Sequence, residues 1–344
     1  MKTDKIRAIL KYLLGNKSYK RLVKFYSNSS QLISLVKNIY QDAALYYKHS
    51  MVFKDDTYNK TESRIILHYH SIEKGFLHEN FRYKFGKWRI VELIELLKYS
   101  HIVEKNKKTQ IAAAYLAMVK YYEIHQLNSV DISEFYLQDD FHLFKSLVTL
   151  DIGTIKENKR NDFFKNNKND FYDFSKSRSS VRNFTKQHIP FEMIDKVIEI
   201  AKTAPSVCNR QPNKVYYVEN KGIIENIFEI QGGLTGYSDD VSQLLVLVSD
   251  RNYFYSVGER NQLYIDGGLF LMNLLYGLHY YKIGACPAHW GLNFEHDKKI
   301  QKLLNLKDSE KVICLIPIGI PKESFYTTLS LRRANNEILK VIDK

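Results

Sequence analysis

The 344-residue sequence contains only three cysteines, six prolines and no long uninterrupted apolar run. The three cysteines, Cys208, Cys286 and Cys314, are scattered and form no C-x-x-C pair, so reduced thiols in a cytosol fit best. A membrane-spanning helix needs about 20 predominantly apolar residues, and the sequence offers no such stretch. The N-terminal residues also lack the apolar core and cleavage site of a signal peptide. Together these absences predict a cytoplasmic protein.

Several functional motifs are missing as well. No G-x-G-x-x-G sequence is present, which argues against a Rossmann dinucleotide-binding domain. No zinc-finger, RNP or helix-turn-helix signature is present, and a nucleic-acid partner is not expected. What the chain has in excess is positive charge, a formal +13, most of it in the N-terminal half. A solvated helical face explains this excess, and binding to nucleic acid or to an anionic membrane surface would explain it equally well.

The length and an apolar content of 44% suggest two hydrophobic cores. Apolar residues recur at helical spacing throughout the first half, which predicts a mainly α-helical domain over residues 1–155. Residues 156–176 are rich in Asn, Lys and Asp with isolated phenylalanines, and predict a linker. Beyond them, strand-like stretches such as LLVLVSD and VICLIPIGIP alternate with helical ones. Residues 177–344 are therefore predicted to form an α+β domain.

The stretch SRSSVRNF opens this second domain and places Arg178 and Arg182 four residues apart. Guanidinium groups match the acceptor oxygens of a phosphate with forked donors and stay charged. Ser179 and Ser180 add hydroxyl and backbone donors between them. From these residues alone, a phosphate site and an ordinary surface both remain open.

A second polar stretch, APSVCNRQPN, follows about twenty residues later. Ser206, Asn209 and Gln211 offer hydroxyl and amide groups without net charge. Such a set could hydrogen-bond the pyrimidine edge of a flavin, where donors and acceptors alternate. An ordinary turn is the alternative, because Pro, Ser and Asn are frequent in turns.

The order of these motifs resembles the nitroreductase family of FMN-dependent oxidoreductases. R-S-S-V-R-x-F is followed by a helix and by A-P-S-x-x-N-x-Q-P. Then come DGGLFLMNLLYGLHYYKIGACP, similar to the family's central helix, LIPIGIP, similar to its P-[IV]-G-x-P strand, and SLRRANNEIL, similar to its closing arginine segment. The resemblance covers about residues 175–344. It implies a nitroreductase-like α+β fold, with a mixed or antiparallel central sheet flanked by helices.

The resemblance also implies a chemistry. FMN would take hydride from NADH or NADPH, bound transiently, and pass it through flavin N5 to an electron-poor acceptor in a ping-pong reaction. Family members form homodimers with FMN at the subunit interface, which we expect here. The residues that match cofactor-binding positions of the family are Arg178, Ser179, Ser180, Arg182, Ser206, Asn209, Gln211 and either Arg332 or Arg333.

Two further features concern the substrate. The resemblance places the segment from Pro287 to Trp290 where a backbone N–H of the family usually faces flavin N5. Here AHW replaces the family's frequent Glu-Gly or Gly, so the Trp290 indole is a candidate to stack near the ring instead. The H-x-I-E-K-G stretch resembles extended members that are associated with bacterial polysaccharide gene sets. We hypothesise that His70, Glu73 and Lys74 lie over the flavin pocket and select the substrate. No metal site is expected, because two histidines two residues apart do not share a helix face.

A second hypothesis assigns no catalysis. The chain would be a flavin-fold adaptor that docks through its basic helical half to a membrane surface or an acidic partner. The first 25 residues are basic and amphipathic, as interfacial helices can be.

Overall fold

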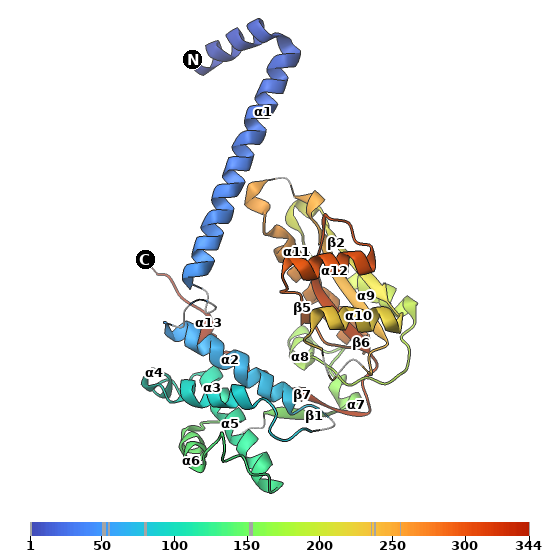
Figure 1. The fold of residues 1–344 in the computed structure, drawn as a ribbon. Coiled ribbons are helices and arrows are strands. Elements are labelled where there is room, and N and C mark those ends of the chain that lie inside the picture. Colours follow the sequence, from blue (N-terminus) through green and yellow to red (C-terminus); the bar gives the residue numbers. More distant parts are fainter. Residues whose placement is uncertain are drawn as a thin grey trace. The chain divides into compact units, whose positions relative to one another are not determined.

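The computed structural model describes residues 2–49, 53, 56–78, 81–150, 154–234, 236, 239–254 and 256–343, and only the backbone of residues 2–8. The helices are α1 (Lys2–His49), α2 (Tyr58–Gly75), α3 (Lys87–Leu97), α4 (Ser100–Val103), α5 (Thr109–Leu127), α6 (Gln138–Leu147), α7 (Arg160–Phe163), α8 (Phe171–Ser177), α9 (Phe191–Ala201), α10 (Lys221–Gln231), α11 (Gln262–Tyr280), α12 (Phe294–Leu304) and α13 (Asn335–Ile338) (Figure 1). Short 3₁₀ turns are η1 (Val207–Asn209), η2 (Arg251–Tyr253) and η3 (Val257–Glu259). The strands are β1 (Ile155–Lys159), β2 (Asn213–Val218), β3 (Gln243–Asp250), β4 (Gly284–Ala285), β5 (Ala288–His289), β6 (Glu310–Gly319) and β7 (Ser324–Thr328).

The chain divides into two compact units, and the smaller one consists of Met1–Asp56 with Tyr255–Arg260. Its main element, α1, is broken at Gly15, whose φ of 71° and ψ of 158° lie outside the helical region and suit glycine. Figure 1 shows the bend in the dark blue part of α1. The Arg260 guanidinium donates to both carboxylate oxygens of Asp42, at 2.7 and 2.8 Å, and ties η3 to α1.

The second unit comprises Thr57–Phe254 and Asn261–Lys344. Its first part, α2 to α6, is helical and has its own hydrophobic core. Buried alanines on α5 leave room for neighbouring helices, and two of its tyrosines hydrogen-bond through their hydroxyl groups within the core. Tyr115 donates to the Leu97 carbonyl and Tyr121 to the Phe85 carbonyl, both at 2.8 Å. The prediction that the first half is mainly helical is confirmed.

A five-stranded antiparallel sheet organises the rest of this unit. Its order is β2-β3-β6-β4, and β5 also pairs with β6. All residues of β3 are buried, and alternate side chains enter different cores, because successive residues of a strand point to opposite faces. Leu244 and Val246 pack with α10 and α12, whereas Leu245 and Leu247 pack with α9 and α11. The predicted α+β fold is therefore confirmed, and every ladder in the described part is antiparallel.

Residues 156–176, which the sequence predicted as a linker, are folded. They contain most of β1, which pairs antiparallel with β7, followed by α7 and α8. Phe163, Phe164 and Phe174 are buried, and this burial of apolar surface holds the segment in place. The division into compact units falls after Asp56 and on either side of Tyr255–Arg260. Among the described residues, no helix is long and apolar enough to cross a membrane.

Candidate functional site

The first predicted motif is fixed by the sheet. Arg178 follows the last residue of α8 with extended backbone angles, φ −69° and ψ 125°. The Val181 N–H donates to the Ala285 carbonyl of β4 at 2.9 Å, and the Val181 side chain is fully buried. Ser179 and Ser180 are half-buried between the two arginines. Burial of Val181 thus holds the flanking polar residues at the edge of the core.

Positive charges converge on this segment. Burial and the Arg332 guanidinium both lower the pKa of Arg178. Burial and the Arg182 guanidinium lower the pKa of Lys74, which lies at the C-terminal end of α2. Charges of one sign affect each other's pKa in this way only when they lie close together. The structure therefore gathers Arg178, Arg182, Arg332 and Lys74, which we call the cation cluster.

The adjacent residues Arg332 and Arg333 have different surroundings. Arg333 donates to both carboxylate oxygens of the buried Glu62, at 2.8 and 3.2 Å, and to Glu337 at 3.4 Å. Arg332 donates to the Ser330 carbonyl at 2.8 Å, and its charge adds to the effect of burial in lowering the pKa of Arg178. Within the described ranges, no ion pair joins Arg178 or Arg332 to a carboxylate. Of the two candidates, Arg332 belongs to the cation cluster and Arg333 to an internal ion pair.

The end of α2 supplies the other predicted pocket residues. His70 Nδ1 lies 3.0 Å from the buried carboxylate of Glu73, while Lys74, the next residue, belongs to the cation cluster. His78, which the sequence analysis missed, lies close to Gly236, where an added Cβ would come within 2.8 Å of its ring. Burial lowers the pKa of His78, and so do Arg82 and Arg182.

The two histidines of the H-x-H stretch have separate partners. His68 lies 3.2 Å from both Glu92 and Arg89, whereas His70 pairs with Glu73. In the part of the chain that the structure describes, no group of three or more His, Cys, Asp or Glu side chains is placed to hold a metal ion.

The second predicted motif forms a compact loop. Ser206 Oγ accepts a hydrogen bond from the Gln211 N–H at 3.0 Å, and Gln211 Nε2 donates to Asn209 Oδ1 at 3.2 Å. The values of φ at Cys208, Asn209 and Gln211 are +49°, +54° and +50°, so three residues adopt the left-handed conformation. The Val207 N–H donates to the Asp266 carboxylate of α11 at 3.2 Å, which anchors the loop.

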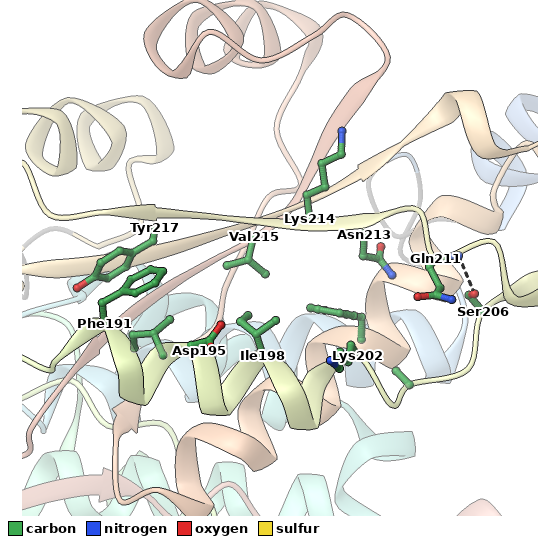
Figure 2. Close-up of a pocket in the computed structure, with 13 residues that line it drawn as sticks. Phe191, Asp195, Ile198, Lys202, Ser206, Gln211, Asn213, Lys214, Val215 and Tyr217 are labelled. Carbon is green, nitrogen blue, oxygen red and sulfur yellow. Dashed lines mark hydrogen bonds between the residues drawn. The ribbon is translucent and has the colours of Figure 1, made fainter.

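A cavity of about 300 Å³ opens beside this loop, between α9 and β2 (Figure 2). Its walls are apolar along Ile198 and Val215, and Ser206 and Gln211 close one end. Figure 2 shows Tyr217 and Phe191 at the opposite end.

The two motifs lie at opposite ends of α11. The loop is held by Asp266 near its first turn, and Ser177, next to Arg178, lies 2.7 Å from His279 in its last turn. At 1.5 Å per residue, the interval from Asp266 to His279 spans about 20 Å. The structure therefore brings the first motif together with Arg332 and Lys74. It brings Ser206, Asn209 and Gln211 together elsewhere.

The expectation for Trp290 is corrected. Its side chain is 5% exposed and packs in the core beneath α10 and α12. Its indole N–H donates to Asp297 Oδ1 at 2.7 Å. Trp290 is a core residue whose polar atom is satisfied internally, and its indole is not available to stack on a ligand.

The fold and the site together define a class of protein: an α+β domain with an antiparallel sheet and a cationic site at the edge of that sheet. The model of the nitroreductase family matches residues 175–246 and 238–320. Residues 175–320 therefore form a nitroreductase-family domain, preceded by a helical region, as the motifs predicted.

Individual relatives are distant. An iodotyrosine deiodinase of Hydra vulgaris is 25% identical over 206 residues, covering 51% of this chain and 74% of its own. A solved nitroreductase-like protein from Streptococcus mutans is 23% identical, covers 51% of this chain and 98% of its own, and gives a TM-score of 0.43. A solved FMN-dependent nitroreductase from Clostridium difficile R20291 is 19% identical, covers 48% and 92%, and gives a TM-score of 0.39.

Proposed function

We propose that this protein is an FMN-dependent oxidoreductase that accepts hydride from NADH or NADPH and reduces an electron-poor acceptor. The observation that carries the proposal is the cation cluster. Arg178 and Arg332 lie close enough for one guanidinium to lower the pKa of the other. Such a pair is stabilised by an anion with several acceptor oxygens, and a phosphate monoester carries about −1.5 to −2 charges. The donor set therefore fits the phosphate of FMN.

The residues of the cluster would have distinct roles. Arg178 and Arg332 hold the phosphate, and Ser179 and Ser180 add hydroxyl and backbone donors. Arg182 would supply a fixed positive charge close to Lys74. That charge would favour the reduced, anionic form of a bound flavin ring. FMN, when bound, supplies the capacity to take up and release hydride. The chain's own contribution is to bind, orient and provide charge.

We further propose that the protein acts as a homodimer in which each site uses both chains. The polar loop and the cation cluster lie at opposite ends of α11, so a second copy would supply the loop that completes each site. The exposed face of α11 fits this, with Tyr264, Ile265 and Leu269 exposed by 50, 55 and 43%. A Cβ at Gly268 would meet nothing within 4 Å, which leaves room for an approaching helix.

Lys74 is the residue we propose to select the acceptor, with His70 and Glu73 positioning the end of α2. It comes from the helical region yet lies beside Arg182. The names of relatives suggest two acceptor classes for trial, an iodinated tyrosine and a nitroarene. A nitroarene has an electron-poor ring, and reduction of an iodinated tyrosine breaks its carbon–iodine bond and releases iodide. In both cases a cation at Lys74 would favour negative charge developing on the substrate.

The visible absorption spectrum of the purified protein tests the cofactor directly. We expect a flavin spectrum that bleaches when NADH or NADPH is added without oxygen and returns when an acceptor is added. A colourless protein that does not take up added FMN would overturn the proposal and favour the adaptor hypothesis. A bound flavin that neither nicotinamide reduces would leave the cofactor assignment intact and refute the donor.

A further inference from the structure

The long helix α1 carries an apolar stripe with a strict heptad spacing. From Tyr19 onward, the residues recur at alternating intervals of three and four for about four heptads. They are Tyr19, Leu22, Tyr26, Ser29, Ile33, Val36, Tyr40, Ala43 and Tyr47. A second row flanks the stripe on one side, consisting of Phe25, Leu32, Ile39 and Tyr46. This spacing is that of a coiled-coil seam.

The seam is open to solvent. Ten of its large side chains are 45 to 77% exposed. Two smaller contributions to the stripe, Tyr19 and Ser29, are half-buried. On the opposite side of the helix, Ser34, Leu35, Asn38 and Asp42 are half-buried, and Asp42 pairs with Arg260. The seam therefore faces away from η3, the segment that packs on α1 in the same compact unit.

Charge is kept out of the seam. Lys17, Lys20, Arg21 and Lys24 all fall at outward heptad positions, and neither row of the seam holds a charged residue. An interfacial membrane helix would place its apolar face at a period of 3.6 residues with lysines along its borders. The apolar residues of α1 recur every 3.5 residues on average over four heptads. This spacing keeps a narrow apolar stripe facing one partner helix when the two helices supercoil.

We infer that the seam of α1 binds the α1 seam of a second copy of this chain, forming a two-stranded coiled coil. The stripe from Tyr19 to Tyr47 is about 43 Å long at 1.5 Å per residue. With roughly 150–250 Å² per aromatic side chain, the exposed seam offers on the order of 1,000 Å² per helix. A stable interface needs about 800 Å² per partner. This inference does not rest on the flavin or on the α11 interface.

Disulfide trapping in the full-length protein tests it. All variants carry Cys208→Ser, because Cys208 is an exposed native thiol. Ile33→Cys lies at the centre of the seam and meets its own counterpart in a parallel pair. Ile33→Cys combined with Val36→Cys allows position 33 to meet position 36 in an antiparallel pair. Gln31→Cys, exposed on the other side of the helix, is the matched control.

We expect at least tenfold faster disulfide-linked dimer formation in a seam variant than in the Gln31→Cys control. Trapping by Ile33→Cys alone gives a parallel pair, and trapping only in the double variant gives an antiparallel one; either supports the inference. Rates equal to the control in both would overturn it. Co-sedimentation with vesicles of 30% phosphatidylserine, lost on Ile33→Asp and accompanied by no trapping, would assign the seam to a membrane surface instead.

Discussion

Buried charges lie near both ends of α11, but their surroundings differ. Near its first turn, Asp266 is 1% exposed, and its carboxylate accepts hydrogen bonds from the Val207 N–H and from Gln262 Nε2 at 2.8 Å. Near its last turn, burial and then the nearby Arg332 charge lower the pKa of Arg178. One end neutralises its charge with donors of the same chain. The other end places like charges together.

The difference shows which end needs a ligand. A buried ion without hydrogen-bonding partners costs several kcal/mol, so a chain retains it only where something compensates. At the Asp266 end, hydrogen bonds from the same chain compensate the charge, and they also fix the loop from Ser206 to Gln211. At the Arg178 end, the compensating anion would come from outside, as the proposed phosphate does.

The largest effect is expected from removing the phosphate ligands. Arg178→Ala and Arg332→Ala should each weaken FMN binding at least a hundredfold, since each removes charge-assisted hydrogen bonds worth about 1.5–3 kcal/mol apiece. Fluorescence titration of the apoprotein with FMN measures this. Arg333→Ala is the matched control, expected to leave FMN affinity within threefold while lowering thermal stability, because buried Glu62 loses its partner. Equal losses in Arg332→Ala and Arg333→Ala would contradict the assignment.

A mixing experiment tests whether each FMN site takes the cation cluster from one chain and the polar loop from its partner. Arg178→Ala and Asn209→Ala protomers, each unable to bind FMN tightly, are co-expressed with different tags. Half of a random population is mixed dimers, and each mixed dimer holds one intact site, so flavin should return to about a quarter of all sites. Homodimers of either variant, purified alone, are the control. No recovery would mean that both motifs act within one chain.

Acid should lower the free energy of unfolding through His279, which lies beside Arg178. Burial and the Arg178 charge lower the pKa of His279 from the usual 6.5 to about 4. Between these values the unfolded chain binds a proton that the folded chain does not, so the free energy of unfolding falls as the pH drops from about 6.5 to 4. The loss is about 3 kcal/mol. Urea unfolding at several pH values should show this slope, and His279→Gln should flatten it; an unchanged slope in that variant would assign the effect to other groups.

At the opposite end, the expected effect is smaller. Asp266→Asn keeps the shape but loses the charge that strengthens the bonds from Val207 and Gln262, so we expect a loss of about 1–2 kcal/mol in stability. Urea unfolding measures it, with Asp297→Asn, an acid bound to Trp290 and Lys311, as a comparison away from the loop. A loss above 3 kcal/mol would show that Asp266 supports more than the loop.

The sequence predicted the domain well because its motifs depend on short spacings. Arg178 and Arg182, or Ser206 and Gln211, lie within a few residues of each other, so local geometry places each pair. The choice between Arg332 and Arg333 could not be made this way. It depends on Glu62, some 270 residues away, which draws one guanidinium into an ion pair.

Other outcomes also depended on distant contacts. The sequence predicted Trp290 near a bound ring, but its indole donates to Asp297 and its side chain packs in the neighbouring core. Asp266 opens the DGGLFLMNLLYG motif and His279 lies within the same apolar helix, but only their contacts reveal what each side chain holds. Residues 156–176 resemble a linker in composition, yet three phenylalanines and the pairing with β7 fold them.

The pairing of β1 with β7 also limits how this chain can be cut. β7 leads directly into the segment with Arg332, and its partner β1 lies ahead of residue 175, where the family match begins. Gln110 of the helical region donates to the Leu331 carbonyl at 3.1 Å, and Thr109 to Glu337 at 2.7 Å. A fragment trimmed to the family boundaries would thus discard both Arg332 and the surface that positions it. Any truncation or domain exchange should therefore keep the helical region that begins at Thr57 together with the segment that follows β7.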